Sequence, residues 1–374
     1  MASHVIGIIS RSDLQHLIPS GAARITDLKG VSSYTWIDTP TPTIAVPGSP
    51  RFWSPPATDV QLPKDTGLYY ATENAARLPG SPMAPLFAAL FTTNPSFDIR
   101  PIDVISDRNF IRRLLWFVNP VSDRDAAEPF ITKLELVGNT LLFGRHETAV
   151  TRHVARNEYH GHGYEFEKSY TTKQIAGSTS HYSIISYRFC GLNMMIRCQT
   201  DAFASSKRGA DAAREGFFDR LDSRTLPPRK RTEPTADTSL KKVKVLKKGR
   251  TIPLESIVEI MTCAQVRSLE FDDIAPQLWM SQTPKLVRAY HYGGLFSKPA
   301  VEYVGFKVKK WERENQHDLE TLGALIEKII GVMKGCGGGC GKLQHDVATA
   351  SLIIFRDEDE TGMLPEDLYS KWNE

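Results

Sequence analysis

The chain has 374 residues, 41% of them apolar, which is enough for one large domain or two smaller ones with a sizeable core. Its formal net charge of +3 at pH 7 is too small to indicate nucleic-acid binding by itself, and five cysteines without paired spacing exclude a disulfide framework. No N-terminal targeting signal and no apolar run of membrane length is found. These features predict a soluble intracellular protein, nuclear or cytoplasmic, with no membrane partner.

The first 65 residues are rich in Pro, Ser and Thr, yet they contain Trp36 and Trp53. Because disordered segments seldom contain tryptophan, we expect an irregular arm docked on the rest of the chain, and residues 66–374 as a single domain. Within that domain the apolar spacing predicts helices over 83–90 and 109–118. Two alternating runs then flank Gly138-Asn139 and predict a hairpin of strands over 130–136 and 140–145.

Chemically informative residues lie on four extended runs further along the chain: 163–167, 183–189, 194–201 and 257–262. Side chains alternate between the two faces of a strand, so Gln199 and Asp201 share one face, and Glu259 and Met261 share another. Carboxylate and carboxamide oxygens are ligands for Mg²⁺ or Mn²⁺. Together with Glu167 at the end of the first run, these side chains supply most of the metal ligands expected of a metal-dependent nuclease site.

The composition changes between residues 204 and 250, where basic residues far outnumber acidic ones and prolines disfavour a helix. We predict a disordered, solvated insertion that interrupts the domain. A nuclear import signal or an arm that contacts phosphates is the alternative, and it is compatible with disorder.

The last part of the sequence contains two helical patterns and a strand. A helix from Pro276 is expected to end or bend at Pro284, an amphipathic helix covers 311–334, and a strand covers 352–355. Cys336 and Cys340 have the wrong spacing for a metal or redox motif, so a flexible loop is expected there. The histidines at three nearby positions lack metal-ligand spacing: His160, His162 and His181.

The order of these motifs resembles the decapping nuclease family of DXO type, which removes messenger RNAs with incomplete or non-standard 5′ caps. The motifs are, in order, Arg145, the run 163–167 (GYEFE), Gln199-Thr-Asp201, Glu259-Ile-Met261 and Gln282. The resemblance covers residues 130–355. It implies a mixed α/β (α+β) fold with a largely antiparallel two-sheet core and outer helices.

The resemblance also implies roles for individual residues. Mg²⁺ or Mn²⁺ would be held by Glu167, Asp201 and Glu259, which with Gln282 form the catalytic set. Arg145 and Gln282 would contact the 5′ end of the RNA. An exonuclease is a candidate protein partner.

Two positions depart from the family pattern. Gln199 stands where the family has glutamate, and Met261 stands where it has lysine. Loss of one such electrostatic contact typically costs about 10²–10³ in rate. The sequence therefore leaves two interpretations open, a metal-dependent hydrolase and a non-catalytic RNA- or protein-binding relative with the same fold.

A prenyl diphosphate synthase (geranylgeranyl pyrophosphate synthetase) is a third and weaker alternative. Such enzymes hold Mg²⁺ with aspartate-rich helical motifs. Here Asp272-Asp273 has no third aspartate at helical spacing, and the chain is rich in proline and in strand patterns. The chemistry for that activity is absent from the sequence.

Overall fold

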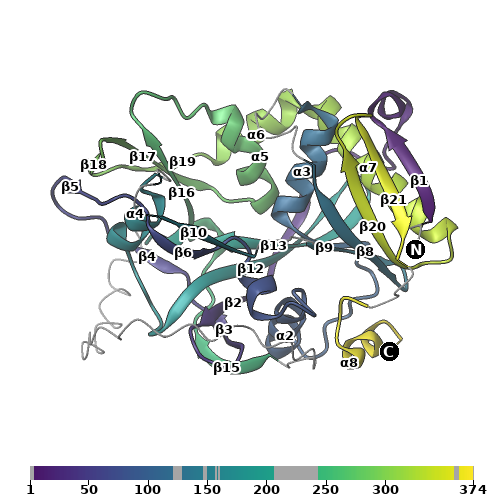
Figure 1. The fold of residues 1–374 in the computed structure, drawn as a ribbon, viewed down its shortest axis with the longest axis horizontal. Coiled ribbons are helices and arrows are strands. Elements are labelled where there is room, and N and C mark those ends of the chain that lie inside the picture. Colours follow the sequence, from purple (N-terminus) through teal and green to yellow (C-terminus); the bar gives the residue numbers. More distant parts are fainter. Residues whose placement is uncertain are drawn as a thin grey trace.

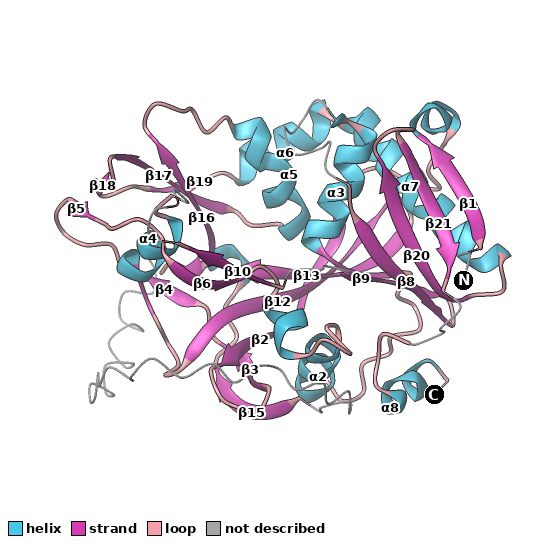
Figure 2. Ribbon diagram, in the orientation of Figure 1, coloured by secondary structure: helices cyan, strands magenta, loops and turns pink. Residues whose placement is uncertain are grey.

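The computed structural model describes residues 4–120, 129–145, 150–155, 158, 161–205, 243–357 and 362–373. It shows a mixed α+β fold built on two sheets that are largely antiparallel, with helices outside, as predicted (Figure 2). In the described residues, no helix combines the length and apolar character needed to cross a membrane.

The large sheet has eleven strands, and its two outer strands on one side come from opposite ends of the chain. Val5 on the first strand pairs with Phe355 on the last. In spatial order the strands are β1 (Val5–Ser10), β21 (Ser351–Arg356), β20 (Gly339–Asp346), β8 (Ile131–Val137), β9 (Thr140–Arg145), β7 (Val104–Asp107), β13 (Leu192–Thr200), β12 (Ser178–Phe189), β2 (Thr26–Ile37), β3 (Thr43–Gly48) and β15 (Lys244–Gly249).

The small sheet continues the large one through the chain itself, because β13 runs directly into one of its strands. Its members are β11 (Thr171–Thr172), β4 (Arg51–Trp53), β14 (Ala202–Phe203), β16 (Ile257–Ala264), β17 (Lys285–Tyr292), β18 (Leu295–Phe296), β5 (Val60–Gln61) and β19 (Val301–Tyr303). A separate two-stranded antiparallel sheet pairs β6 (Gly67–Tyr70) with β10 (Thr151–Val154).

Helices cover both faces of the large sheet (Figure 1). On one face lie α3 (Arg108–Val118), α5 (Phe271–Ser281), α6 (Gly305–Glu314) and α7 (Gln316–Gly335). On the other lie α2 (Ala84–Thr93) and α8 (Glu366–Tyr369), while α1 (Glu73–Arg77) and α4 (Gly163–Tyr170) lie beside the two-stranded sheet and the small sheet. Each face has its own apolar cluster, with Trp279 and Leu322 in one and Trp36 and Phe87 in the other. This burial of large side chains fixes the sheet between two helical layers.

Several predicted elements are confirmed. Helices α2 and α3 occupy the predicted segments 83–90 and 109–118, the β8–β9 hairpin forms, and β21 contains the predicted last strand. The sheet-rich architecture also excludes the all-helical fold of a prenyl synthase, with Asp272 and Asp273 in the first turn of α5.

Other predictions about the elements are wrong. The first 65 residues supply paired strands, including β2 and β3 of the large sheet, instead of an irregular arm. The expected single helix over 311–334 is two helices that meet at Asn315. Residues 244–249, expected to be disordered, form β15 parallel to β3, whereas residues 206–242 of the predicted insertion lie outside the described part of the chain. The run 163–167 begins a helix, α4, instead of a strand.

Candidate active site

Asp201 lies where the chain passes from the large sheet into the small one. Strand β13 ends at Thr200, and the next two residues form β14, whose Ala202 pairs with Val258 of β16. The Asp201 carboxylate accepts a hydrogen bond from the backbone N–H of Ile260, with an N–O distance of 2.9 Å. This junction therefore brings the end of the Gln199–Asp201 motif against the Glu259 motif.

Glu259 is buried, with 4% of its surface exposed, on the face of β16 opposite to Val258 and Ile260, as the alternation predicted. Its carboxylate accepts hydrogen bonds from two residues. Arg108 at the start of α3 donates to it at 2.9 Å, and the side-chain amide of Gln277 in α5 donates to its other oxygen. Burial of a carboxylate is costly without such partners, so this ion pair explains how Glu259 is accommodated.

Glu167 is positioned by α4, whose first turn is held by a residue far away in the sequence. The Asp65 carboxylate accepts hydrogen bonds from the backbone N–H groups of Tyr164 and Glu165, at 3.1 and 3.0 Å. An acceptor of this kind satisfies N–H groups that a helix start leaves unpaired. Phe166 then packs into the apolar cluster of the small sheet. Glu167 lines a small cavity of about 40 Å³ together with Arg51, Gln199 and Asp201.

The protonation of the carboxylates reflects their crowding. Burial raises the pKa of Glu167 to about 7, the nearby Arg51 opposes that rise, and the charges of Glu259 and Asp65 add to it. Burial, followed by the charges of Glu259 and Glu167, raises the pKa of Asp201 well above its ordinary value. Both carboxyl groups therefore resist ionisation, and a bound cation would favour their ionised forms.

A cleft of about 530 Å³ adjoins this region and is lined by arginine, tyrosine and amide side chains. Gln199 lines both the cleft and the small cavity and so connects them. Arg112 of α3 donates a hydrogen bond to Gln277 at 2.6 Å, which links the cleft wall to Glu259. Cationic and aromatic side chains together suit phosphate groups and bases.

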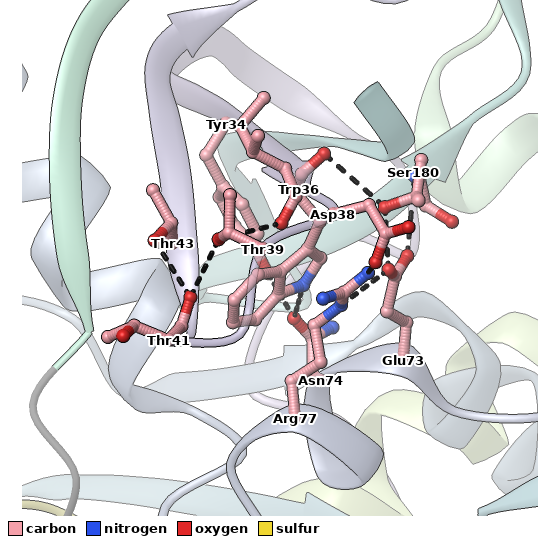
Figure 3. Close-up of polar contacts among 12 residues, drawn as sticks. Tyr34, Trp36, Asp38, Thr39, Thr41, Thr43, Glu73, Asn74, Arg77 and Ser180 are labelled. Carbon is pink, nitrogen blue, oxygen red and sulfur yellow. Dashed lines mark hydrogen bonds and ion pairs between the residues drawn. The ribbon is translucent and has the colours of Figure 1, made fainter. Parts of the chain in front are cut away.

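A buried polar network holds the opposite wall of the cleft, where α1 contributes Glu73 and Asn74 (Figure 3). Tyr34 and Trp36 of β2 both donate to the Asn74 side-chain oxygen, each at 2.8 Å. Glu73 accepts from Arg77 at 2.7 Å and from the backbone N–H of Ser180 at 3.3 Å (Figure 3). These contacts fasten α1 to the large sheet.

Not all predicted site residues lie in this region. Met261 is partly buried and packs against the apolar cluster beneath α3 and α5. Gln282 caps the end of α5 with a φ of 51° and donates to the Trp279 carbonyl, whereas the α5 glutamine that contacts Glu259 is Gln277. Arg145 ends β9, but its side chain lies outside the described part of the structure.

The sequence reasoning missed Arg108, Arg112 and Gln277. Arg108 and Arg112 lie four residues apart on α3, which places them on one helix face, and this spacing was the available signal.

Of the histidines that lack metal-ligand spacing, His162 and His181 are buried, and His181 also lines the small cavity with Glu167 and Asp201. His162 packs edge-on against His291. His181 shares a hydrogen bond with Thr35 at 2.8 Å, and burial lowers its pKa to about 3. His160 lies outside the described residues.

The oxygen donors of this region meet the requirements of a divalent metal ion in part. Over the described ranges, no three His, Cys, Asp or Glu side chains are placed so that they could hold one ion. Glu259 is bonded to Arg108 and Gln277 instead. Glu167 and Asp201 nevertheless line one cavity with the Gln199 amide, and hard divalent cations prefer oxygen donors of these kinds. The residues present therefore fit a divalent ion through two carboxylates and an amide.

The family model described as "Domain of unknown function (DUF8563)" matches residues 4–372. The chain belongs to this family. No curated protein matches the DUF8563 chain.

Solved structures with similar folds are known from yeasts. Rai1 of Scheffersomyces stipitis in complex with (3′-NADP)⁺ and calcium ion is 12% identical, with a TM-score of 0.59 over 96% of this chain and 98% of that one. Rai1 of Candida albicans in complex with pU5-Mn²⁺ is 12% identical, with a TM-score of 0.58 over 96% and 98%. Dxo1 of K. lactis in complex with manganese is 9% identical, with a TM-score of 0.51 over 94% and 98%. The DUF8563 chain has the Rai1/Dxo1 fold, so the fold implied by the resemblance is confirmed.

Proposed function

We propose that this protein is a divalent-metal-dependent hydrolase of RNA 5′ ends, with a metal centre weakened at Gln199 and Met261. The observation that carries the proposal is the convergence of Glu167, Asp201 and Glu259 from three separate elements. Burial and neighbouring negative charges raise the pKa of Glu167 and Asp201, and the ionised forms of such carboxylates cost folding free energy unless a cation neutralises them. The adjoining cleft supplies cationic and aromatic side chains for a nucleotide.

The proposed ligands are supported by those of the solved structures with a similar fold. The name of the C. albicans structure gives pU5-Mn²⁺, and that of the S. stipitis structure gives (3′-NADP)⁺ and calcium ion. We extend ligands of this chemistry to the present chain: an RNA with a 5′ phosphate or a nucleotide cap, and a divalent ion, Mg²⁺ or Mn²⁺.

The proposed roles follow from position. Glu167 and Asp201, with Gln199, would hold the ion, and Glu259 would join them when Arg108 turns to the substrate. The ion would supply Lewis-acid stabilisation of phosphate charge and a more acidic water. Arg108 and Arg112 would bind the phosphates, and Gln277 would orient Glu259.

A second candidate function is binding of an RNA 5′ end, or of a protein partner such as an exonuclease, without catalysis. Gln199 and Met261 favour it, since both lack the charge of the family residues, and the Arg108–Glu259 ion pair favours it as well. An intracellular location, nuclear or cytoplasmic, is part of both proposals.

The deciding experiment is Mn²⁺-dependent release from 5′-end-labelled RNAs bearing a monophosphate, a triphosphate, an unmethylated cap or an NAD cap. The same RNAs are tested for binding by fluorescence anisotropy. Glu259→Ala and Met261→Lys are run beside the parent protein.

Release that Glu259→Ala abolishes supports the hydrolase. Release only in Met261→Lys, with binding in the parent, supports a lapsed centre and the second candidate. Neither release nor 5′-end binding in any variant would contradict both RNA functions.

A further inference from the structure

The two-stranded β6–β10 sheet is separate from the large and the small sheet and borders the cleft. Its strand β6 contributes Leu68, Tyr69 and Tyr70 to the cleft lining. Tyr70 is attached to the molecule from below, because the Arg77 guanidinium lies over its ring at 5.2 Å from the centroid. Arg77 belongs in turn to the polar network around α1 (Figure 3). The β6–β10 sheet is thus a fixed wall of the cleft that carries two tyrosine rings.

Tyr69 of this wall stacks on Tyr164, the second residue of α4. The ring centroids are 4.0 Å apart and the planes differ by 10°. The Tyr69 hydroxyl donates to the Thr66 carbonyl at 2.8 Å, which holds its ring in place. Both rings line the cleft, and 43% of the Tyr164 surface is exposed.

A purely structural role for this pair would be to attach the β6–β10 sheet to α4, and α4 offers a direct comparison. Phe166 and Tyr170 on the same helix also stack at 4.0 Å and 16°, and both are fully buried. That pair packs the helix onto the small sheet. The Tyr69–Tyr164 pair has the same geometry but faces the cleft. Exposure of the apolar face of an aromatic ring to water costs free energy, and a ligand stacked on that face removes this cost.

The position of Tyr164 relates this platform to the carboxylates. Tyr164 and Glu167 are three residues apart on α4, so their Cβ atoms lie about 5–6 Å from each other. Asp65 fixes the turn that contains Tyr164. A flat ring stacked on Tyr164 is therefore within one nucleotide of Glu167, with Arg108 in the same cleft.

We propose that Tyr69 and Tyr164 form a stacking platform for the base of the 5′-terminal nucleotide. This inference rests on the proposed binding of RNA 5′ ends and adds the recognised group: an unpaired base, read through its π-face and hence with little preference among the four. A 5′ nucleotide paired in a duplex cannot reach the platform without leaving its stack, so single-stranded ends are the preferred substrate.

The test compares two short single-stranded RNAs with a 5′ monophosphate and a 3′ fluorophore. One carries a base at the first position, and the other is abasic there. Affinities are measured by anisotropy with the parent protein, Tyr164→Leu, Tyr164→Phe and the control Tyr292→Leu. Tyr292 is 75% exposed on β17 and is not among the cleft-lining residues. A third RNA with 2-aminopurine at the first position reports stacking through fluorescence quenching.

The parent protein is expected to bind the base-bearing RNA about tenfold more tightly than the abasic RNA, the usual scale for one stacked base. Tyr164→Leu should lose this ratio and the quenching, whereas Tyr164→Phe and Tyr292→Leu should keep both. Equal affinity for the two RNAs in the parent, or an unchanged ratio in Tyr164→Leu, overturns the platform and leaves the proposed function standing. Absence of any 5′-end binding overturns the proposed function and the platform with it.

Discussion

At the scale of single residues, the main feature is an ion pair where the sequence predicted a metal ligand. Arg108 exposes 14% of its side chain and Glu259 exposes 5%. Two charges in such surroundings stabilise each other, but removal of one leaves the other buried and uncompensated.

We therefore expect Arg108→Met to lower the free energy of unfolding by about 3 kcal/mol in metal-free buffer. The measurement is urea denaturation. The control is Arg100→Met, since Arg100 pairs with Asp98 at 2.8 Å but both side chains are about half exposed. That surface pair should contribute under about 1 kcal/mol. Equal stability of the two variants would show that the buried pair has no special weight.

A second residue-level prediction concerns pH. Because the pKa of Glu167 is raised to about 7, the folded state holds this proton more tightly than the unfolded state, with an ordinary value of 4.5. The contribution of Glu167 to stability is therefore favourable at low pH and is lost as the pH rises from about 4.5 through 7.

Glu167→Gln removes this dependence. With EDTA present, the variant should match the parent near pH 4.5 and exceed it by on the order of 1 kcal/mol at pH 8. Urea denaturation across this range measures the difference. The control is Glu165→Gln on the same helix, where Glu165 pairs with Lys168. A difference that does not grow with pH would contradict the raised pKa.

Whether the sequence predicts a site residue depends on whether its position is set by local structure or by the packing of distant elements. The alternation rule places Glu259 and Gln199 correctly, because strand faces follow from residue number alone. Gln277 and Arg108 could not be chosen in this way. Which turn of a helix meets the sheet depends on the docking of α3 and α5, whereas Gln282, five residues further on, was assigned through the family resemblance.

At the scale of elements, the polar network around α1 decides how firmly the cleft wall is held. Asn74 is 93% buried, and its side-chain oxygen accepts from both Tyr34 and Trp36. A helix of five residues has little stability of its own, so these tertiary contacts hold it.

Asn74→Ala leaves two buried donors without an acceptor, and we expect a loss of about 2 kcal/mol or more in the free energy of unfolding. The control is Asn94→Ala, because Asn94 is exposed and its side-chain oxygen accepts from the exposed Ser96 hydroxyl at 3.1 Å. Chemical denaturation gives both values. A loss in Asn74→Ala no larger than in the control would mean that the network does not hold α1.

The run 163–167 shows why an element can be mistaken. Its alternating aromatic and acidic residues suit a strand as well as a short helix. The helix is selected by Asp65, which caps it from about 100 residues earlier in the chain, and by the small sheet that receives Phe166. Neither contact can be seen in the local sequence.

At the scale of the whole molecule, the resemblance to the DXO-type family predicted the architecture, whereas the hydrophobic pattern predicted only individual helices and strands. Two largely antiparallel sheets with outer helices are confirmed, but the strand order is not a local property. The Pro-rich first 65 residues illustrate this, since β2 and β3 are held by pairing with β12 and β15, far along the chain.

The pairing of β1 with β21 has a consequence for synthesis on the ribosome. Val5 leaves the ribosome before its partner Phe355, which follows about 350 residues later. At about 5–20 residues per second, β1 waits roughly 20–70 s for the strand that completes its edge of the sheet. Throughout that interval the backbone N–H and C=O groups of β1 lack their native partner. The strand can therefore be bound by chaperones, or can aggregate, before folding is complete.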